Sequence, residues 1–486
     1  MSRITLDLDN LGDTPIDQPY LIEAERDGEF VQDRGPFVSY RRFATGESSY
    51  RIEAELPKTD LTFLFRPAFS RMLKGRGRLL RRLMPPAPLS PESLSMLGLM
   101  FWTTTIIAYC GTLLGQTLAF AAPTLRASAF AQAAALSTTR VDVLLALPLA
   151  RMADRRIGRA RMLRAGVVLA VGATTLASLS PNIYWLTALE ILAKAGATTS
   201  TLLIAIILTE TVEETARAWS LAVLVIATAF GTGAAAIMVA GLGLTPQAWR
   251  LMFLIAAVGF VLAARLRRLR DTPRFLSHPR DLPAKALLDR THRKRLIIVS
   301  LAACMINLFY IPQSQLRNQF LRFDRHLSAP EISLFTLGTN LPGGIGLAIG
   351  ARWSEVRGRK PVAAFGLFAG AIFTALAFLS SGWLLFTFAA LGAAAGTIAV
   401  PPMAVYGPEL FPTRLRASAN ALITALSRVG SIVGLFLVGL GASNGLGYGL
   451  PIAMLATAPL LLSLVVLLFF PETRGTSLES INPEDL

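Results

Sequence analysis

Long runs of uncharged, mostly apolar residues alternate with short arginine-rich stretches from about residue 97 onward. A run of about 20 apolar residues is long enough for a helix to cross the hydrocarbon core of a membrane. The sequence therefore predicts an all-α membrane protein with twelve transmembrane helices. Their expected centres lie near Thr104, Leu144, Leu169, Thr198, Val225, Leu254, Ala302, Asn340, Phe368, Leu391, Val433 and Leu461.

Charged motifs at the ends of these runs occur twice, about 200 residues apart. Residues 154–159 (DRRIGR) return as residues 355–360 (EVRGRK), and 355 − 154 is 201. A glutamate followed seven residues later by an arginine also occurs twice, since 409 − 210 is 199. Duplicated halves with a site between them are typical of secondary transporters. The repeat predicts two pseudo-symmetric six-helix halves, which we place at residues 93–270 and 295–471.

The position of the positive charge indicates how the chain lies in a membrane. Only 16% of the 486 residues are charged, against about a quarter in a soluble domain. The net charge of +16 is concentrated in the links after even-numbered helices, at residues 151–164, 265–295 and 352–360. Basic loops stay in the cytoplasm. We therefore expect a multi-pass protein of the cytoplasmic membrane with a cytoplasmic linker (271–294), both termini cytoplasmic, and no nucleic-acid partner.

One link departs from this charge pattern. The segment after the seventh apolar run carries Arg317, Arg322 and Arg325, although it should face outward. The other links still determine the predicted topology.

The N-terminal extension, residues 1–92, has an acidic part and a basic part. Residues 61–91 hold seven bases and no acid, so we expect this segment to contact anionic lipid headgroups. Residues 37–43 and 49–56 alternate apolar and polar side chains and are able to pair as a hairpin. We favour a tail without fixed structure over a regulatory module. Residues 472–486 form the other tail, and no signal peptide is visible.

Several of these motifs resemble a known family of membrane proteins. Residues 151–161 resemble the loop between helices two and three of the major facilitator superfamily, and residues 355–360 resemble its second copy between helices eight and nine. Residues 408–414 (PELFPTR) and 471–475 (PETRG) are similar to motifs of its sugar-porter and organic-ion-transporter branch. The resemblance covers about residues 95–480 and implies a transporter rather than an enzyme.

The repeated motifs also predict a cytoplasmic gate. Glycine allows a tight turn, and acids at helix ends pair with arginines. Ion pairs that form in one state and break in another suit a rocking mechanism, although charges that only set the topology remain an alternative. The expected gating residues are Asp154, Arg155, Gly158, Arg159, Glu210, Arg217, Glu355, Gly358, Arg359, Glu409 and Arg416.

Ionisable side chains inside the apolar runs are candidates for function, because such groups are costly at membrane depth. Asp142 and Glu190 are the expected proton-coupling residues. Lys194 lies one turn after Glu190 and can pair with it, which is the structural alternative. Arg428 has no acid in its own span. Because Lys194 and Arg428 belong to different halves and a guanidinium suits a carboxylate, we expect both to bind an organic anion.

Uncharged polar side chains complete the expected substrate-binding set. Tyr109 and Gln116 lie on the first span, and Asn307, Tyr310 and Gln313 form a polar stripe on the seventh. Hydrogen bonding between helices is the alternative role for that stripe.

The sequence offers nothing that indicates catalysis. Its three histidines and two cysteines lack metal-ligand spacing, and it has no phosphate-binding glycine loop. We therefore expect no enzyme activity, cofactor or metal. The predicted function is a monomeric secondary active transporter that moves a small organic solute, with an organic anion preferred and the proton as candidate coupling ion. The alternatives are an efflux pump for hydrophobic compounds and a receptor that binds solute without transporting it.

Overall fold

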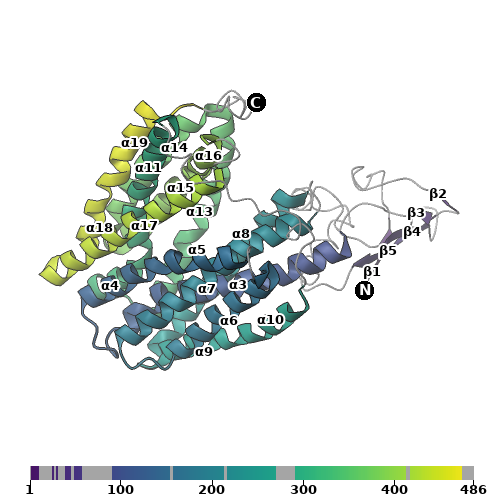
Figure 1. Ribbon diagram of the computed structural model, residues 1–486, viewed down its shortest axis with the longest axis horizontal. Coiled ribbons are helices and arrows are strands. Elements are labelled where there is room, and N and C mark those ends of the chain that lie inside the picture. The colour runs from purple at the N-terminus through teal and green to yellow at the C-terminus, as the bar shows by residue number, and fades with distance from the viewer. Residues whose placement is uncertain are drawn as a thin grey trace.

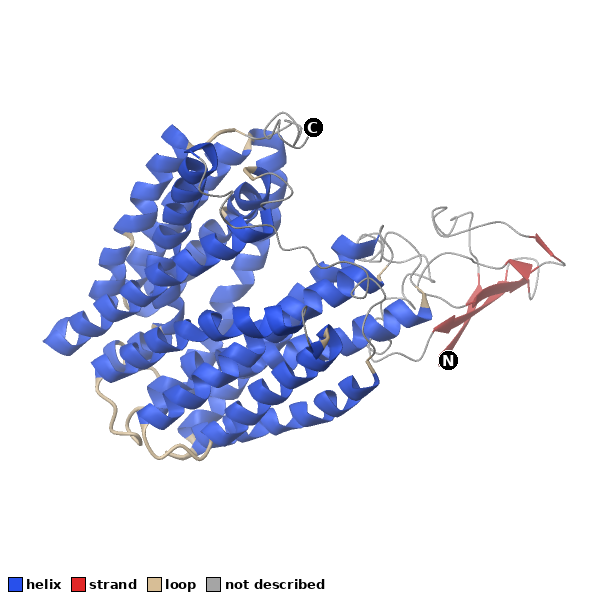
Figure 2. Ribbon diagram, in the orientation of Figure 1, coloured by secondary structure: helices blue, strands red, loops and turns tan. Residues whose placement is uncertain are grey.

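The computed structural model describes most of the apolar region of the chain and short strands of the N-terminal extension. The described residues are 2–9, 25–26, 29–30, 39–44, 49–56, 90–153, 157–212, 216–269, 290–411 and 416–472. Twelve helices within these ranges are long and apolar enough to cross a membrane. The predicted fold class is therefore confirmed (Figure 2).

Two groups of helices follow one another along the chain (Figure 1). The first half comprises α3 (Pro91–Ala121), α4 (Ala129–Thr138), η2 (Thr139–Val141), α5 (Asp142–Met152), α6 (Arg159–Ala177), α7 (Ile183–Thr211), α8 (Arg217–Met238), η5 (Val239–Gly243), α9 (Ala248–Ile255), η6 (Ala256–Val258), α10 (Gly259–Arg265) and η7 (Leu266–Arg268). The second half comprises α11 (Arg290–Gln315), α12 (Arg317–Gln319), η10 (Phe320–Asp324), α13 (Ala329–Arg357), α14 (Arg359–Leu379), α15 (Gly382–Ile398), α16 (Val400–Glu409), α17 (Arg416–Gly441), η11 (Ala442–Leu446), α18 (Gly449–Leu455) and α19 (Thr457–Phe469).

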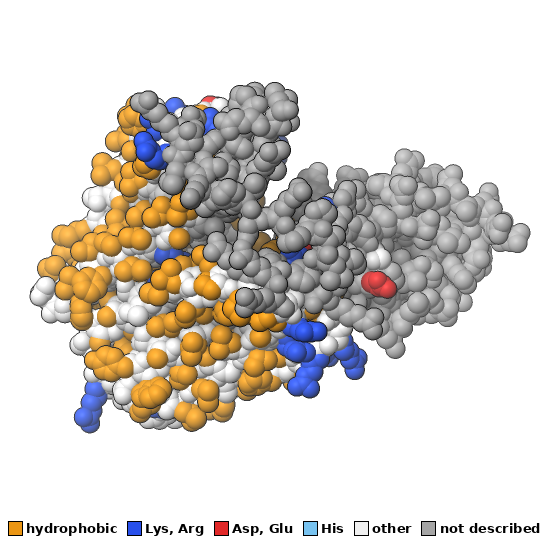
Figure 3. All heavy atoms as spheres, in the orientation of Figure 1, with side chains coloured by type: hydrophobic (Ala, Val, Ile, Leu, Met, Phe, Trp, Pro, Cys, Tyr) orange, Lys and Arg blue, Asp and Glu red, His pale blue; other side chains and the backbone are white. Residues whose placement is uncertain are grey.

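The outer surface of both halves is apolar. Figure 3 shows hydrophobic side chains spread over the visible face, with most of the visible lysines and arginines near the helix ends. Val258 is 64% exposed and Leu468 is 71% exposed, each inside a membrane span, which would be unfavourable in water but is favourable against lipid. Trp185 and Trp383 are both exposed at the starts of α7 and α15, at corresponding positions of the repeat, where aromatic side chains suit the membrane–water interface.

The repeat is visible in the backbone at two glycines. Gly158 precedes α6 with φ 94° and ψ 145°, and Gly358 precedes α14 with φ 100° and ψ 151°. This region of φ and ψ is open essentially to glycine alone. The two halves therefore make the same turn with the same residue, 200 positions apart.

Helices within the second half approach closely at glycines. A Cβ atom added at Gly346 or Gly350 would collide with the backbone of α15, and one added at Gly430 or Gly434 would collide with the backbone of α11. Small residues at four-residue spacing let transmembrane helices pack backbone to backbone. This packing fixes α13 against α15 and α17 against α11.

The second span differs from the prediction of a continuous helix centred near Leu144. It covers Ala129–Leu149 and consists of α4, the 3₁₀ turn η2 and α5. The tight turn falls at Thr139–Val141, directly before Asp142. The interruption therefore lies beside a charged residue at membrane depth.

The N-terminal extension contains a small antiparallel sheet. Strands β4 (Ser39–Ala44) and β5 (Ser49–Leu56) pair as predicted for a hairpin. Strand β1 (Ser2–Asp9) pairs with the other edge of β5, which the sequence analysis did not predict. The prediction of a tail without fixed structure is therefore wrong for these segments. Strands β2 (Glu25–Arg26) and β3 (Glu29–Phe30) form a separate short pair. The basic segment predicted to contact lipid lies outside the described residues.

The two halves contact each other mainly at one end, which we call the closed end. There, Ser137 of α4 donates a hydrogen bond to the carbonyl of Ile432 in α17 (3.1 Å), and Ser333 of α13 donates one to the carbonyl of Ala236 in α8 (2.8 Å). The halves diverge toward the opposite end (Figure 1). The turns at Gly158 and Gly358 lie at this opposite end, which we call the open end.

Candidate functional site

A cavity of about 730 Å³ lies between the halves, and we call it the central cavity. Helices α11, α13, α14, α15 and α16 of the second half supply most of its walls. The rest comes from α12 and η10 of the same half and from α3 and α8 of the first half. A volume of this size is suited to a small organic molecule. Its walls combine apolar and small side chains with amides and hydroxyls.

Four of the seven predicted substrate-binding residues line this cavity. Gln116 reaches it from α3, and Asn307, Tyr310 and Gln313 reach it from α11. The Asn307 amide also donates a hydrogen bond to the carbonyl of Ala303, 2.8 Å away within the same helix. The polar stripe predicted on the seventh span therefore faces the space between the halves.

Tyr310 lies at a point where two helices make room for its ring. A Cβ atom at Gly370 of α14 or Gly396 of α15 would come within 2.9 Å or 3.0 Å of the Tyr310 hydroxyl. That hydroxyl is buried and has no hydrogen-bond partner among the described residues. It is enclosed between α14 and α15, while Tyr310 as a whole contributes to the cavity wall.

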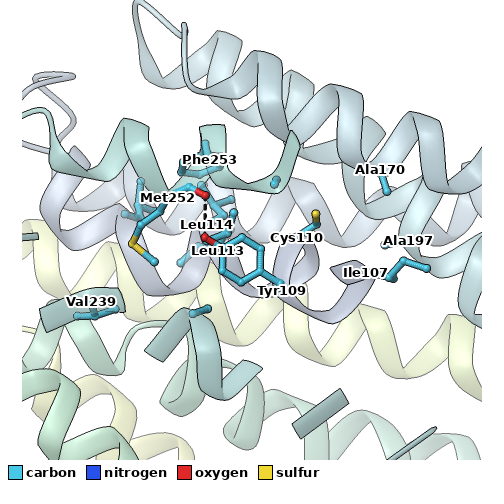
Figure 4. Packing of buried hydrophobic residues seen from close by; sticks show 14 of the residues in the cluster. Ile107, Tyr109, Cys110, Leu113, Leu114, Ala170, Ala197, Val239, Met252 and Phe253 are labelled. Atoms are coloured by element: carbon cyan, nitrogen blue, oxygen red, sulfur yellow. Dashed lines mark hydrogen bonds between the residues drawn. The ribbon is translucent and has the colours of Figure 1, made fainter. Parts of the chain in front are cut away.

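Tyr109 does not reach the central cavity. Its ring is 4% exposed in the core of the first half, and its hydroxyl donates a 2.7 Å hydrogen bond to the carbonyl of Met252 (Figure 4). A buried tyrosine hydroxyl usually has such a partner. The structure therefore gives Tyr109 a structural contact between α3 and α9.

Lys194 and Arg428 also lie away from the residues that line the central cavity. The Lys194 ammonium donates a 2.8 Å hydrogen bond to the hydroxyl of Thr139 in η2. Arg428 of α17 is half-buried and interacts electrostatically with Arg140 and with Lys194. The two cations therefore belong to a charge cluster where α17 meets η2 and α7.

The two predicted proton-coupling residues belong to the same region. The Thr198 hydroxyl donates a 2.6 Å hydrogen bond to one carboxylate oxygen of Asp142. Glu190 is fully buried, and neither of its oxygens has a hydrogen-bond partner among the described residues. The direct pair of Glu190 with Lys194, which was the structural alternative, is therefore not made, because the lysine donates to Thr139 instead. The two charges still interact at longer range.

The open end carries part of the predicted gate. Arg159 at the start of α6 forms an ion pair with Glu210 at the end of α7. Gly158 makes the turn before that pair, as expected. Asp154 and Arg155 lie outside the described residues, and the structure describes only the backbone of Glu409 and Arg416. Arg217 is half-buried at the start of α8.

The corresponding turn in the second half uses a different acid. The Glu472 carboxylate, from the segment after the last span, accepts hydrogen bonds from the backbone N–H groups of Arg359 (2.9 Å) and Lys360 (3.1 Å). Carboxylates stabilise the N-terminal end of a helix in this way. Glu355 is exposed just before Gly358, and its gating role stays a prediction.

Most residues that line the central cavity were not among the predicted site residues, and Arg317 is the charged one of these. It belongs to the segment expected to form a basic outward-facing loop, lies at the closed end and contributes to the cavity wall. Hydropathy and charge counts give the side of the membrane on which an arginine lies, but not the direction in which its side chain points.

No group of three or more His, Cys, Asp or Glu side chains able to hold a metal occurs among the described residues. Comparison with known proteins places the chain in a family. The family model of the Major Facilitator Superfamily matches residues 93–319 and 311–485. The chain belongs to the Major Facilitator Superfamily. It is thus a multi-pass membrane protein of a transporter family, not an enzyme.

Solved structures with the same fold include three transporters. A bacterial homologue of the human lysosomal transporter Spinster, inward-facing and unoccupied, has a TM-score of 0.67 at 18% identity, over 82% of this chain and 98% of that one. The inward-open xylose transporter XylE from Escherichia coli has a TM-score of 0.67 at 16% identity, over 81% and 99%. The nucleoside transporter NupG has a TM-score of 0.66 at 14% identity, over 77% and 100%.

Two curated relatives match shorter stretches of the chain. The putative metabolite transport protein YaaU of Escherichia coli is 43% identical over 76 residues, or 15% of this chain and 16% of that protein. Solute carrier family 22 member 4 of Mus musculus is 38% identical over 90 residues, or 18% of this chain and 15% of that protein. Each match spans about a sixth of the relative's own length.

Proposed function

We propose that this protein is a secondary active transporter that moves a small organic anion across the cytoplasmic membrane by alternating access, coupled to protons. The observation that carries the proposal is the central cavity, which lies between two repeat-related halves whose described contacts gather mainly at one end. A cavity open to one side, between halves able to rock, is what alternating access requires. Both termini would lie at the open, cytoplasmic end.

The charge cluster supports the proposal that the solute is an anion. Arg140, Lys194 and Arg428 supply three positive charges against two from Asp142 and Glu190. Excess positive charge at membrane depth is costly. It also attracts an anion into the protein. Electrostatics therefore favours organic anions over organic cations.

Glu190 supports the coupling to protons. A fully buried carboxylate without hydrogen-bond partners among the described residues is suited to gain and lose a proton during a transport cycle. Asp142, in the same region, has one buried oxygen with no hydrogen-bond partner among the described residues. These two acids are the candidates for the coupling site.

Counterflow in proteoliposomes tests the proposal. Vesicles preloaded with benzoate, succinate, glucose or tetraethylammonium are diluted into the same radiolabelled compound. We expect labelled benzoate or succinate to accumulate transiently inside the vesicles. This accumulation should be faster when the outside is more acidic than the inside, so that the proton gradient points inward. Binding of a solute without any counterflow would support a receptor instead. If only glucose or tetraethylammonium exchanged, the proposal of an anionic solute would be wrong, but the proposal of a transporter would stand.

A further inference from the structure

Arg317 is the only charged residue among the described residues that line the central cavity. It follows Pro312 and Gln315 of the seventh span and begins the short helix α12. The neighbouring Asn318 amide donates hydrogen bonds to the backbone carbonyl (2.9 Å) and the side-chain oxygen (3.0 Å) of Gln116 in the other half. Arg317 therefore lies where the two halves close the cavity.

The guanidinium of Arg317 has few partners. Its Nη1 atom donates only a long 3.4 Å hydrogen bond to the side-chain oxygen of Asn340. Its Nε atom is buried and has no partner among the described residues. No carboxylate forms an ion pair with it in the part of the chain that the structure describes. Of the five N–H donors of a guanidinium, most are thus left for another molecule.

The other two arginines of this segment differ in that respect. Arg322 stacks on the ring of Phe120, with 4.2 Å from its guanidinium carbon to the ring centre. Arg325 donates hydrogen bonds to the carbonyls of Ser380 (2.9 Å) and Phe378 (3.3 Å). Both have structural contacts, whereas Arg317 is half-buried, with a buried Nε atom and unused donors. A buried cation without a counter-charge is costly, and a bound anion would offset that cost.

We propose that Arg317 binds the carboxylate of the transported solute at the closed end of the central cavity. It thus has the role that the sequence had suggested for Lys194 and Arg428. This inference rests on the proposed function and names the residue that selects the solute. A guanidinium holds a carboxylate through two parallel hydrogen bonds. The rest of the solute occupies the less polar part of the cavity, between Tyr310 and Phe335.

The charge of Arg317 is present under physiological conditions. Burial lowers the pKa of the Arg317 guanidinium to about 10. The group therefore stays protonated at neutral pH and loses its charge only as the pH rises through that value. Binding of a carboxylate at this residue should not vary between about pH 6 and pH 9, because carboxylates are ionised throughout that range as well.

Binding to purified protein tests the proposal with matched probes. Benzoate and succinate are compared with benzamide and succinamide, which have similar shapes but no charge. The variants are Arg317→Gln, Arg317→Lys and the control Arg126→Gln, which removes an exposed arginine between α3 and α4. We expect Arg317→Gln to weaken carboxylate binding about 10- to 100-fold and leave the amides unchanged. The carboxylate affinity of Arg317→Lys should lie between those of Arg317→Gln and wild type. The affinity of Arg126→Gln should equal that of wild type.

Unfolding temperature without ligand separates this role from a structural one. Removal of a buried cation that lacks a counter-charge should leave the unfolding temperature equal or higher, whereas loss of a structural contact would lower it. The proposal would be overturned by a lower unfolding temperature of Arg317→Gln. It would also be overturned if this variant bound carboxylates as tightly as wild type does, or if no carboxylate bound to the protein at all. Counterflow of a neutral solute that Arg317→Gln leaves intact would overturn it while the transporter function stands.

Discussion

Arg159, in the first turn of α6, forms an ion pair with Glu210, in the last turn of α7. The two side chains are only 16% and 18% exposed, so the pair is more than a solvated surface contact. It joins two helices of the first half at the open end, directly after the turn at Gly158. The pair therefore joins the start of α6 to the end of α7 at the place where we predict a gate.

We predict that Glu210→Gln slows counterflow about tenfold while solute affinity changes less than about twofold, because a partly buried arginine loses its counter-charge. The double exchange Arg159→Glu, Glu210→Arg should recover most of the rate. The control is Glu92→Gln, at an exposed acid in the first turn of α3. A double exchange as slow as the single variant would contradict a role for the pair itself.

Proton coupling gives a second prediction. The double variant Asp142→Asn, Glu190→Gln should abolish the dependence of uptake on a pH gradient, because it removes the carboxylates that lie inside the membrane-spanning helices near the charge cluster. Exchange of solute at equal pH should continue, since exchange needs no net proton movement. Uptake is measured in proteoliposomes with and without the gradient. A gradient effect of wild-type size in the double variant would refute the assignment.

The hydrogen bonds from Asn318 to Gln116 should bias the protein toward the state described. Asn318→Ala removes both hydrogen bonds from the closed end, and each contributes about 1 kcal/mol to the stability of the closed arrangement. The closed end should then open more often. Spin labels at Tyr184→Cys and Trp383→Cys, two exposed sites in different halves, should report a larger fraction of long distances. An unchanged distance distribution would show that these bonds do not control the equilibrium.

The glycines of α17 give a prediction about stability. Gly430→Leu should destabilise the protein by about 1–3 kcal/mol or more, because the added side chain collides with the backbone of Cys304 in α11. Gly338→Leu is the matched control, since a Cβ at Gly338 of α13 meets nothing within 4 Å. Thermal unfolding in detergent distinguishes the two. Equal unfolding temperatures would argue against close packing of α17 on α11.

The twelve spans and the repeat could be predicted because they depend on composition along the chain alone. Span length follows from membrane thickness, and the turns at Gly158 and Gly358 need a residue type that the sequence shows directly. Strand β1 was missed although Ile4, Leu6 and Leu8 alternate with polar residues, since its partner β5 lies more than 40 residues away.

The contacts between helices could not be predicted in the same way. Sequence spacing puts Lys194 one turn from Glu190, but the break of the second span brings Thr139 within 2.8 Å of the lysine and changes its partner. The same limit applies to Arg317 and Arg428. Which of two arginines faces the cavity depends on how each helix is rotated in the bundle, and the hydropathy of its span does not contain that information.

The contact of Glu472 with the start of α14 has a consequence for how the chain folds during synthesis. The carboxylate that completes this helix end is 113 residues further along than the first N–H it accepts from. At about 5–20 residues per second, the ribosome needs roughly 6–23 s to add that length. For this time the start of α14 lacks the Glu472 carboxylate, and this helix end is completed only after the segment that follows the last span has been made.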